Sequence, residues 1–225
     1  FPTRRSSDLL AELAERAGET DTALQAWQRL FADPAQLTAA RALRVAVMLL
    51  LKGRGKEALV WLDKARPGAG LNDAGDVDYW RLSGQLAEMQ QRDAQAIDAF
   101  RRLIEADKAE PGDYDALLRL LNLAAPAEAA PIAARAWRQF DEPRYLIQAL
   151  TLYANRNRWR EIGALLRELD PAPNASRRAL HRLQRMPEFL RLAGTYQQNI
   201  GQFALARRNF EAGLRLAPDA ADLQQ

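Results

Sequence analysis

The chain has 225 residues, no Cys, a single His and a formal net charge of +3. The absence of Cys excludes disulfides, thiolate zinc sites, iron–sulfur clusters and a cysteine nucleophile, and a single His excludes multi-histidine metal sites. With 48% hydrophobic and 27% charged residues, the composition is that of a folded protein. The longest apolar run, Val45 to Leu51, is far shorter than the roughly 20 residues of a membrane-spanning helix.

The first eight residues fit no hydrophobic period. The segment 1–8 resembles translated sequencing-adapter sequence, and no apolar stretch of a signal peptide follows its arginines, so we predict a non-native or disordered leader. From residue 9 onward, a small or aliphatic residue recurs at spacings of 35, 38, 33, 33 and 44, which predicts six repeats of a helix pair. The recurring residues are Ala23, Ala58, Ala96, Ala129, Ile162 and Ala206.

These repeats divide the chain into six units. In chain order the predicted units are about 9–33, 36–70, 77–108, 110–140, 143–170 and 187–218. The spacing of 44 before the last unit predicts an insertion at 171–187, which prolines bracket. Residues 219–225 follow Pro218 and are expected to begin a further or capping helix, as in a fragment of a longer protein.

Prolines mark where several helices begin. Proline is tolerated at the first position of a helix, because its missing N–H would have no intrahelical partner there. Such positions are predicted for Pro34, Pro111, Pro126, Pro143 and Pro187. No stretch of strand length combines period-two alternation with β-branched residues, so we predict an all-α fold.

Two units carry the marked positions of a known repeat of 34 residues. The third unit has Trp80, Gly84, Ala96 and Phe100 at positions 4, 8, 20 and 24 of that frame. The sixth unit matches positions 4, 8, 15, 17, 20, 24 and 32 with Leu190, Gly194, Gly201, Phe203, Ala206, Phe210 and Pro218. These residues resemble the tetratricopeptide repeat (TPR). The resemblance implies a right-handed α-solenoid of about six TPR-like helix pairs, each with a helix A and a helix B, in which small residues at positions 8 and 20 let the helices approach closely.

No motif predicts catalysis or a cofactor. The segment Gly53-Arg54-Gly55-Lys56 lacks the first Gly and the final Ser or Thr of a phosphate-binding loop, so we interpret it as a helix–helix turn. The acidic segment 72–78 lacks EF-hand spacing, and Asp76 or Asp78 is expected to cap the following helix. His181, the single possible histidine base, stands among arginines with no carboxylate nearby. We therefore predict that the chain is not an enzyme and has neither a cofactor nor a metal site.

The TPR resemblance implies where a partner binds. In TPR arrays helix A lines the concave groove with positions 2, 5, 9, 12 and 13 of each unit. Polar residues at these positions interrupt otherwise apolar helices and are typical of a solvated binding face. The partner-binding residues that follow are Arg81, Gln85, Glu88, Arg144, Thr151, Asn155, Arg191, Thr195, Gln198 and Asn199.

Basic residues gather in the C-terminal half. Residues 143–208 hold 12 Arg against four acidic residues, a net charge of +8. A basic surface of this size can attract an acidic protein, an anionic polymer or nucleic acid, and a solvated arginine-rich surface without a partner is the alternative. The uneven repeat spacing argues against an RNA reader with one base per repeat, so nucleic acid is not the favoured partner.

Several segments resemble the periplasmic TPR region of the PelB family, the outer-membrane exporters of the Pel exopolysaccharide of biofilms. They are 78–82, 96–103, 113–121 and 129–137. The resemblance implies a non-catalytic scaffold for protein–protein interaction in the periplasm of a Gram-negative bacterium. There it recruits a polymer-modifying enzyme, such as a periplasmic polysaccharide deacetylase or hydrolase, and guides polymer; membrane contact comes only through parts outside this chain. The alternative is a cytoplasmic regulatory or nucleic-acid-associated TPR-like adaptor.

Overall fold

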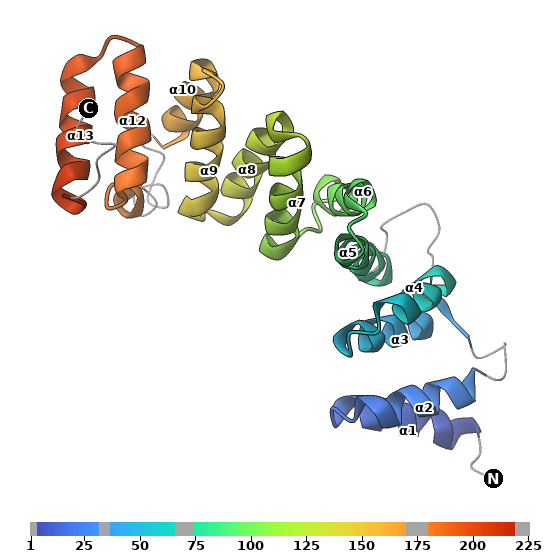
Figure 1. Cartoon of the computed structure of the whole chain (residues 1–225). Helices are drawn as coiled ribbons and strands as arrows, with labels where there is room; N and C mark the ends of the chain where they lie inside the picture. The colour runs from blue at the N-terminus through green and yellow to red at the C-terminus, as the bar shows by residue number, and fades with distance from the viewer. Residues whose placement is uncertain (1–3, 32–36, 66–73, 170–179, 219–225) are drawn as a thin grey trace. The chain divides into compact units, whose positions relative to one another are not determined.

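The computed structural model describes residues 4–31, 37–65, 74–169 and 180–218 (Figure 1). Within these ranges the regular elements are α-helices and no β-strand occurs, so the all-α prediction is confirmed. The chain forms two compact units, Phe1–Asp113 and Tyr114–Gln225. Residues 219–225 and most of the insertion predicted at 171–187 lie outside the described residues.

The first unit is built from helix pairs joined by tight turns, and the two helices of each pair pack side by side (Figure 1). Neighbouring pairs meet where α2 contacts α3 and where α3 and α4 contact α5. α1 begins inside the segment 1–8 that was set aside as a leader, so residues 4–8 are helical. The pairs are α1 (Arg4–Arg16) with α2 (Thr20–Leu30), α3 (Ala39–Leu51) with α4 (Gly55–Lys64), and α5 (Ala74–Met89) with α6 (Asp93–Glu105).

The second unit continues the same construction. α9 lies beside α8, α10 and α12, and α12 packs along α13. Four of these helices begin at a proline, as predicted, whereas Pro34 lies outside the described residues. The helices are α7 (Pro111–Ala124), which starts in the first unit, α8 (Pro126–Phe140), α9 (Pro143–Ala154), α10 (Trp159–Glu168), α12 (Pro187–Asn199) and α13 (Phe203–Leu216).

One predicted helix cap is wrong. α5 begins at Ala74, so Asp76 and Asp78 lie inside its first turns and neither precedes the helix as a cap. A carboxylate in the first turn still stabilises a helix, because it faces the positive end of the helix dipole. Asp76, in the first turn of α5, therefore supports the start of the helix from within.

The repeated small residues lie in the interior, as the repeat frame predicts. All six residues at position 20 are buried, from Ala23 in α2 to Ala206 in α13. The glycines at position 8 face aromatic rings of the paired helix: a Cβ built on Gly84 would lie 2.8 Å from Cζ of Phe100, and one on Gly194 would lie 2.6 Å from Cε1 of Phe210. In these two pairs, α5–α6 and α12–α13, a ring therefore packs directly on the backbone of helix A.

We expect Gly84→Ala to lower the free energy of unfolding by about 1–2 kcal/mol. The added methyl group overlaps the buried ring of Phe100, and overpacking costs about 1–3 kcal/mol, while alanine recovers up to about 1 kcal/mol of helix propensity. Urea denaturation followed by circular dichroism measures the change. Gly112→Ala is the matched control, because a Cβ there meets nothing within 4 Å. A Gly84 variant as stable as the Gly112 variant would contradict the close packing.

The turns between helices A and B need a left-handed backbone residue. Gly18, Gly53 and Gly201 supply it in three pairs, with φ of 75°, 72° and 77°. In two other pairs the same turn is made by Gln91 and Asn157, with φ of 57° and 54°. Glycine adopts this conformation without a Cβ clash, whereas other residues pay for it in strain.

Gln91→Gly should therefore stabilise the chain by about 0.5–1 kcal/mol. The substitution removes the strained Cβ at the α5–α6 turn and leaves the turn residue solvent-exposed. Thermal melting measures the gain. The same change at Gln95, an exposed residue inside α6, should destabilise instead, because glycine weakens a helix interior.

Candidate partner-binding surface

In the first compact unit, Phe1–Asp113, the predicted binding residues lie on α5, which is the helix A of its pair. Gln85 is exposed, and Arg81 and Glu88 are half-buried. Exposed polar side chains on a helix whose other faces are packed are free to meet a partner. Of the three, Gln85 is the one most open to solvent.

Arg81 is already engaged by its own chain. Its Nε donates to both carboxylate oxygens of Asp113 at 3.1 Å, and its Nη2 lies 3.2 Å from a carboxylate oxygen of Glu110. Burial acts to lower the pKa of Arg81, but the hydrogen bond and charge of Asp113 outweigh it, so that pKa is raised. Asp113 is the buried charged residue of this network, and its second oxygen also accepts from the backbone N–H of Glu110 at 2.9 Å. Arg81 thus joins α5 to the start of α7.

Arg144 makes a comparable network in the second unit. Its guanidinium donates to Asp115 on α7 at 2.9 Å and to Glu142 at 2.6 Å, and it also donates to the Tyr145 hydroxyl at 2.9 Å. Tyr145 in turn donates to Asp115 at 2.9 Å. Burial and this hydrogen bond raise the pKa of Tyr145 above its ordinary value. The network fixes the first turn of α9 against α7.

The remaining predicted residues lie on α9 and α12, which pack side by side. The hydroxyls of Thr151 and Thr195 donate to the backbone carbonyls of Ile147 and Arg191 one turn earlier, at 2.8 and 2.9 Å. Asn199 donates similarly to the Thr195 carbonyl at 2.8 Å. The structure brings this group together on adjacent helices, and its most exposed members are Asn155, Gln198 and Asn199.

We expect Gln85→Ala and Asn199→Ala to change the free energy of unfolding by no more than about 0.5 kcal/mol each. Both side chains are exposed, and the Asn199 amide bonds only within its own helix. Urea denaturation checks this. A loss of about 2 kcal/mol or more is on the order of a core deletion. It would mean that these side chains are buried and do not belong to the solvated face.

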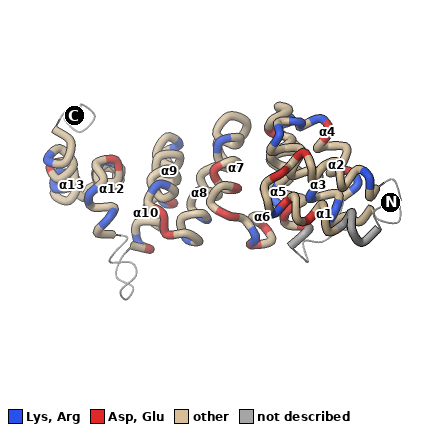
Figure 2. The backbone as a smooth tube through the Cα atoms, turned by 90° about the horizontal axis from the view of Figure 1, so that it is seen from below, with Lys and Arg blue, Asp and Glu red and all other residues tan. Residues whose placement is uncertain are grey.

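The arginine excess of the C-terminal half is partly neutralised. Several of these arginines form ion pairs with carboxylates of the same unit. The pairs are Arg144–Asp115, Arg158–Glu161, Arg182–Asp141 and Arg207–Glu211. Figure 2 shows blue arginines and red carboxylates interspersed along α7 to α10. Such pairing reduces the field that this surface can exert on a distant anion.

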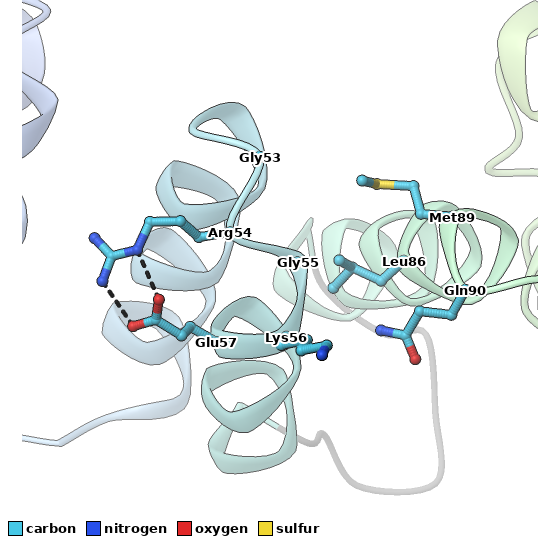
Figure 3. Close-up of a pocket in the computed structure, with 8 residues that line it drawn as sticks. All are labelled: Gly53, Arg54, Gly55, Lys56, Glu57, Leu86, Met89 and Gln90. Carbon is cyan, nitrogen blue, oxygen red and sulfur yellow. Dashed lines mark hydrogen bonds and ion pairs between the residues drawn. The ribbon is translucent and has the colours of Figure 1, made fainter.

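A pocket of about 460 Å³ opens between the α3–α4 turn and the end of α5 (Figure 3). Arg54 in this turn donates to Glu57 through two hydrogen bonds of 2.7 Å. The Glu57 carboxylate therefore already neutralises the cation that a bound phosphate would need. Gly53 has φ of 72° and links two helices, which confirms the interpretation of this segment as a turn. Among the described residues, Nε2 of Gln90 is buried at this pocket without a hydrogen-bond partner.

A second pocket has a volume of about 450 Å³, and its apolar lining was not predicted from the sequence. It is lined mainly by α3, the helix A of the second pair, together with the α1–α2 turn and Asp78 of α5. The α3 residues at groove positions are Ala40, Leu43, Val47 and Leu51. The repeat frame assigns these positions to the groove. Their position in the repeat, and not their polarity, could therefore have predicted that they line a groove.

In the second unit a smaller pocket of about 350 Å³ lies between α7 and α9. Asn122 and the exposed Leu123 line it from α7, and Gln148 lines it from α9. None of these three residues was predicted from the sequence. Gln148 lies one turn before Thr151 on α9.

Within the described ranges, no three His, Asp or Glu side chains converge as ligands for a metal ion. In the same ranges, no helix is both long enough and apolar enough to span a bilayer. The features that stand out on this part of the chain are therefore the helix A faces and their pockets.

A family model described as tetratricopeptide repeat matches residues 32–225. The chain belongs to the tetratricopeptide repeat family, as the spacing of its small and aromatic residues indicates. No curated protein matches the sequence.

Several solved structures are similar to the chain at low sequence identity. YrrB, described as a TPR protein with an unusual peptide-binding site, has a TM-score of 0.57 at 16% identity, over 89% of this chain and 97% of its own. A chain of Naa15/Naa10 bound to HypK has a TM-score of 0.53 at 15% identity, over 96% of this chain and 38% of its own. Pseudomonas aeruginosa PilF has a TM-score of 0.47 at 18% identity, over 98% of this chain and 95% of its own.

Proposed function

We propose that the chain is a non-catalytic scaffold that holds a partner protein on the helix A faces of its repeats. The observation that carries this proposal is that one face of each helix packs in the interior while another face is exposed to solvent. The residues that hold each pair together, such as Gly84 and Phe100, are buried, whereas Gln85, Gln198 and other groove residues are exposed on helices that packing already fixes. A rigid element with exposed side chains suits partner binding. The peptide-binding site described for YrrB supports such a role for this fold.

A finer proposal concerns the cellular setting of the chain, which we call the Pel setting. We propose that the chain is the periplasmic segment of a Pel-type exopolysaccharide export protein, and that its partner is a periplasmic polysaccharide deacetylase or hydrolase. The support is the resemblance of segments 78–82, 96–103, 113–121 and 129–137, which lie on α5, α6, α7 and α8. Basic and acidic residues are interspersed along α7 to α10 (Figure 2) and some of them form ion pairs, an arrangement better suited to a protein than to nucleic acid.

The test uses the full chain immobilised on a biosensor, with the purified periplasmic deacetylase of a Pel system as the probe. We expect saturable binding that the double variant Gln85→Arg/Gln198→Arg weakens at least about tenfold, because both long cations are placed on exposed groove positions. Gln95→Arg is the matched control, since the same substitution then lies on the exposed side of α6, a helix B. Its affinity should equal that of the parent chain.

The outcomes separate the two settings. Absence of deacetylase binding would reject the Pel setting, and weakening by the Gln95 variant alone would reject the helix A faces. A filter-binding titration with single-stranded RNA runs in parallel. RNA binding whose affinity falls steeply with salt would favour the nucleic-acid-associated adaptor instead.

A further inference from the structure

The groove face of α3 differs from those of α5, α9 and α12. On α5, α9 and α12 the groove positions are mostly polar, but on α3 they are Ala40, Leu43, Val47 and Leu51. Leu51 is 79% exposed and Val47 is 38% exposed. An aliphatic row left open to water costs free energy in the free chain, and such patches mark sites where another surface docks.

These residues form a recess rather than a flat patch. They line the pocket of about 450 Å³ together with Met48 and with Gly18 of the α1–α2 turn. A volume of this size accommodates one or two large aliphatic side chains, in the range of known ligand pockets. The site therefore favours a partner that inserts apolar side chains from an extended or helical segment.

The charges beside the recess set the chemistry of that segment. Glu15 of α1 and Asp78 of α5 line it, and one oxygen of Glu15 accepts a hydrogen bond from Nε1 of Trp27 at 2.6 Å. The lining cation, Arg44, lies 3.7 Å from Glu12. Arg81 lies 3.7 Å from Asp78 and also pairs with the buried Asp113. The recess thus presents apolar side chains together with two carboxylates, and the cations Arg44 and Arg81 are each paired with carboxylates of this chain.

We propose that this recess, the α3 groove, binds an amphipathic segment of a partner protein whose apolar side chains are flanked by Lys or Arg. This inference rests on the proposed scaffold function and names the chemistry of its partner. Leucine-like side chains fill the space along Val47 and Leu51, and the flanking cations face Glu15 and Asp78. The carboxylates discriminate against acidic segments, because a like charge brought beside them is repelled.

The test measures fluorescence polarisation of labelled peptides titrated with the full chain. The first peptide has about 14 residues, with leucines at i, i+3, i+4 and i+7 and lysines beside them. The second carries glutamate in place of lysine, and the third carries serine in place of leucine. We expect the first peptide to bind saturably and at least about tenfold more tightly than either of the others.

Variants locate the site. Leu51→Lys should weaken binding of the lysine peptide at least about tenfold, because it adds a cation and removes an aliphatic wall. Val60→Lys is the matched control at a position on α4 that is 57% exposed, and it should leave binding unchanged. Asp78→Lys should weaken the lysine peptide and strengthen the glutamate peptide. All three positions are on the surface, and circular dichroism checks that each variant folds.

Equal affinity for the three peptides, a preference for glutamate, or equal effects of the Leu51 and Val60 substitutions would overturn the proposal. So would self-association in sedimentation that Leu51→Lys abolishes, since the occupant would then be a second copy of the chain. Deacetylase binding without peptide binding would remove this inference and leave the scaffold proposal standing. Peptide binding without deacetylase binding would support the α3 groove and reject the Pel setting.

Discussion

Replacing Phe100 with alanine is expected to lower the free energy of unfolding by about 3–5 kcal/mol. Phe100 is 1% exposed and its ring lies against the backbone of α5 at Gly84. Truncation removes the ring from the centre of the α5–α6 pair, and the gap stays because helix A has no side chain at Gly84 to fill it. Urea denaturation of the parent and variant chains measures the loss.

A double-mutant cycle makes this prediction specific to the helix pair. Gly84→Ala should be costly in the parent chain but neutral or stabilising in the Phe100→Ala background, where the overlapping ring is gone. Additive effects of the two substitutions would mean that the ring and the glycine do not touch. If Phe100→Ala left the free energy of unfolding unchanged, the assignment of residues to repeat positions would be wrong.

The second large effect is expected for Asp113→Ala, at about 2–3 kcal/mol. The substitution removes both acceptors of the Arg81 Nε and the acceptor of the Glu110 N–H, and Asp113 itself is only 3% exposed. The side chain of Arg81 is 21% exposed, so water and Glu110 recover part of the loss and keep it below that of a fully buried pair.

Asp78→Ala is the matched control for this effect. Asp78 also pairs with Arg81, at 3.7 Å, but its side chain is 60% exposed, and such pairs contribute about 0–1 kcal/mol. Asp113→Asn should fall between the two, because the amide oxygen still accepts from Glu110 while the negative charge is lost. If Asp113→Ala costs no more than Asp78→Ala in urea denaturation, the network does not hold residues 110–113 to α5.

The contacts between the two helices of one repeat were the ones best predicted from the sequence. Gly84, Ala96 and Phe100 are set by the close approach of two helices within one pair, so a fixed spacing reveals them. Contacts between pairs have no such signal. Tyr196 of α12 packs directly on Gly163 of α10, and Arg81 reaches Asp113 in the next pair, although nothing in the local pattern of either segment indicates its partner.

The candidate site was predicted in part for the same reason. Two residues at predicted groove positions, Gln85 and Gln198, are exposed, but a position alone does not reveal what its side chain contacts. Arg81 and Arg144 have groove positions and yet hold neighbouring helices of their own chain. Conversely, Val47 and Leu51 were overlooked because aliphatic residues on a helix are expected to be buried, whereas here they line an open recess.

Hydrogen–deuterium exchange of the full chain, with and without saturating deacetylase, tests most directly whether the helix A faces are the binding surface. Protection on binding is expected in α5, α9 and α12, with α6, α10 and α13 unchanged as internal references. Protection confined to α6, α10 and α13 would contradict a scaffold that binds through its helix A faces.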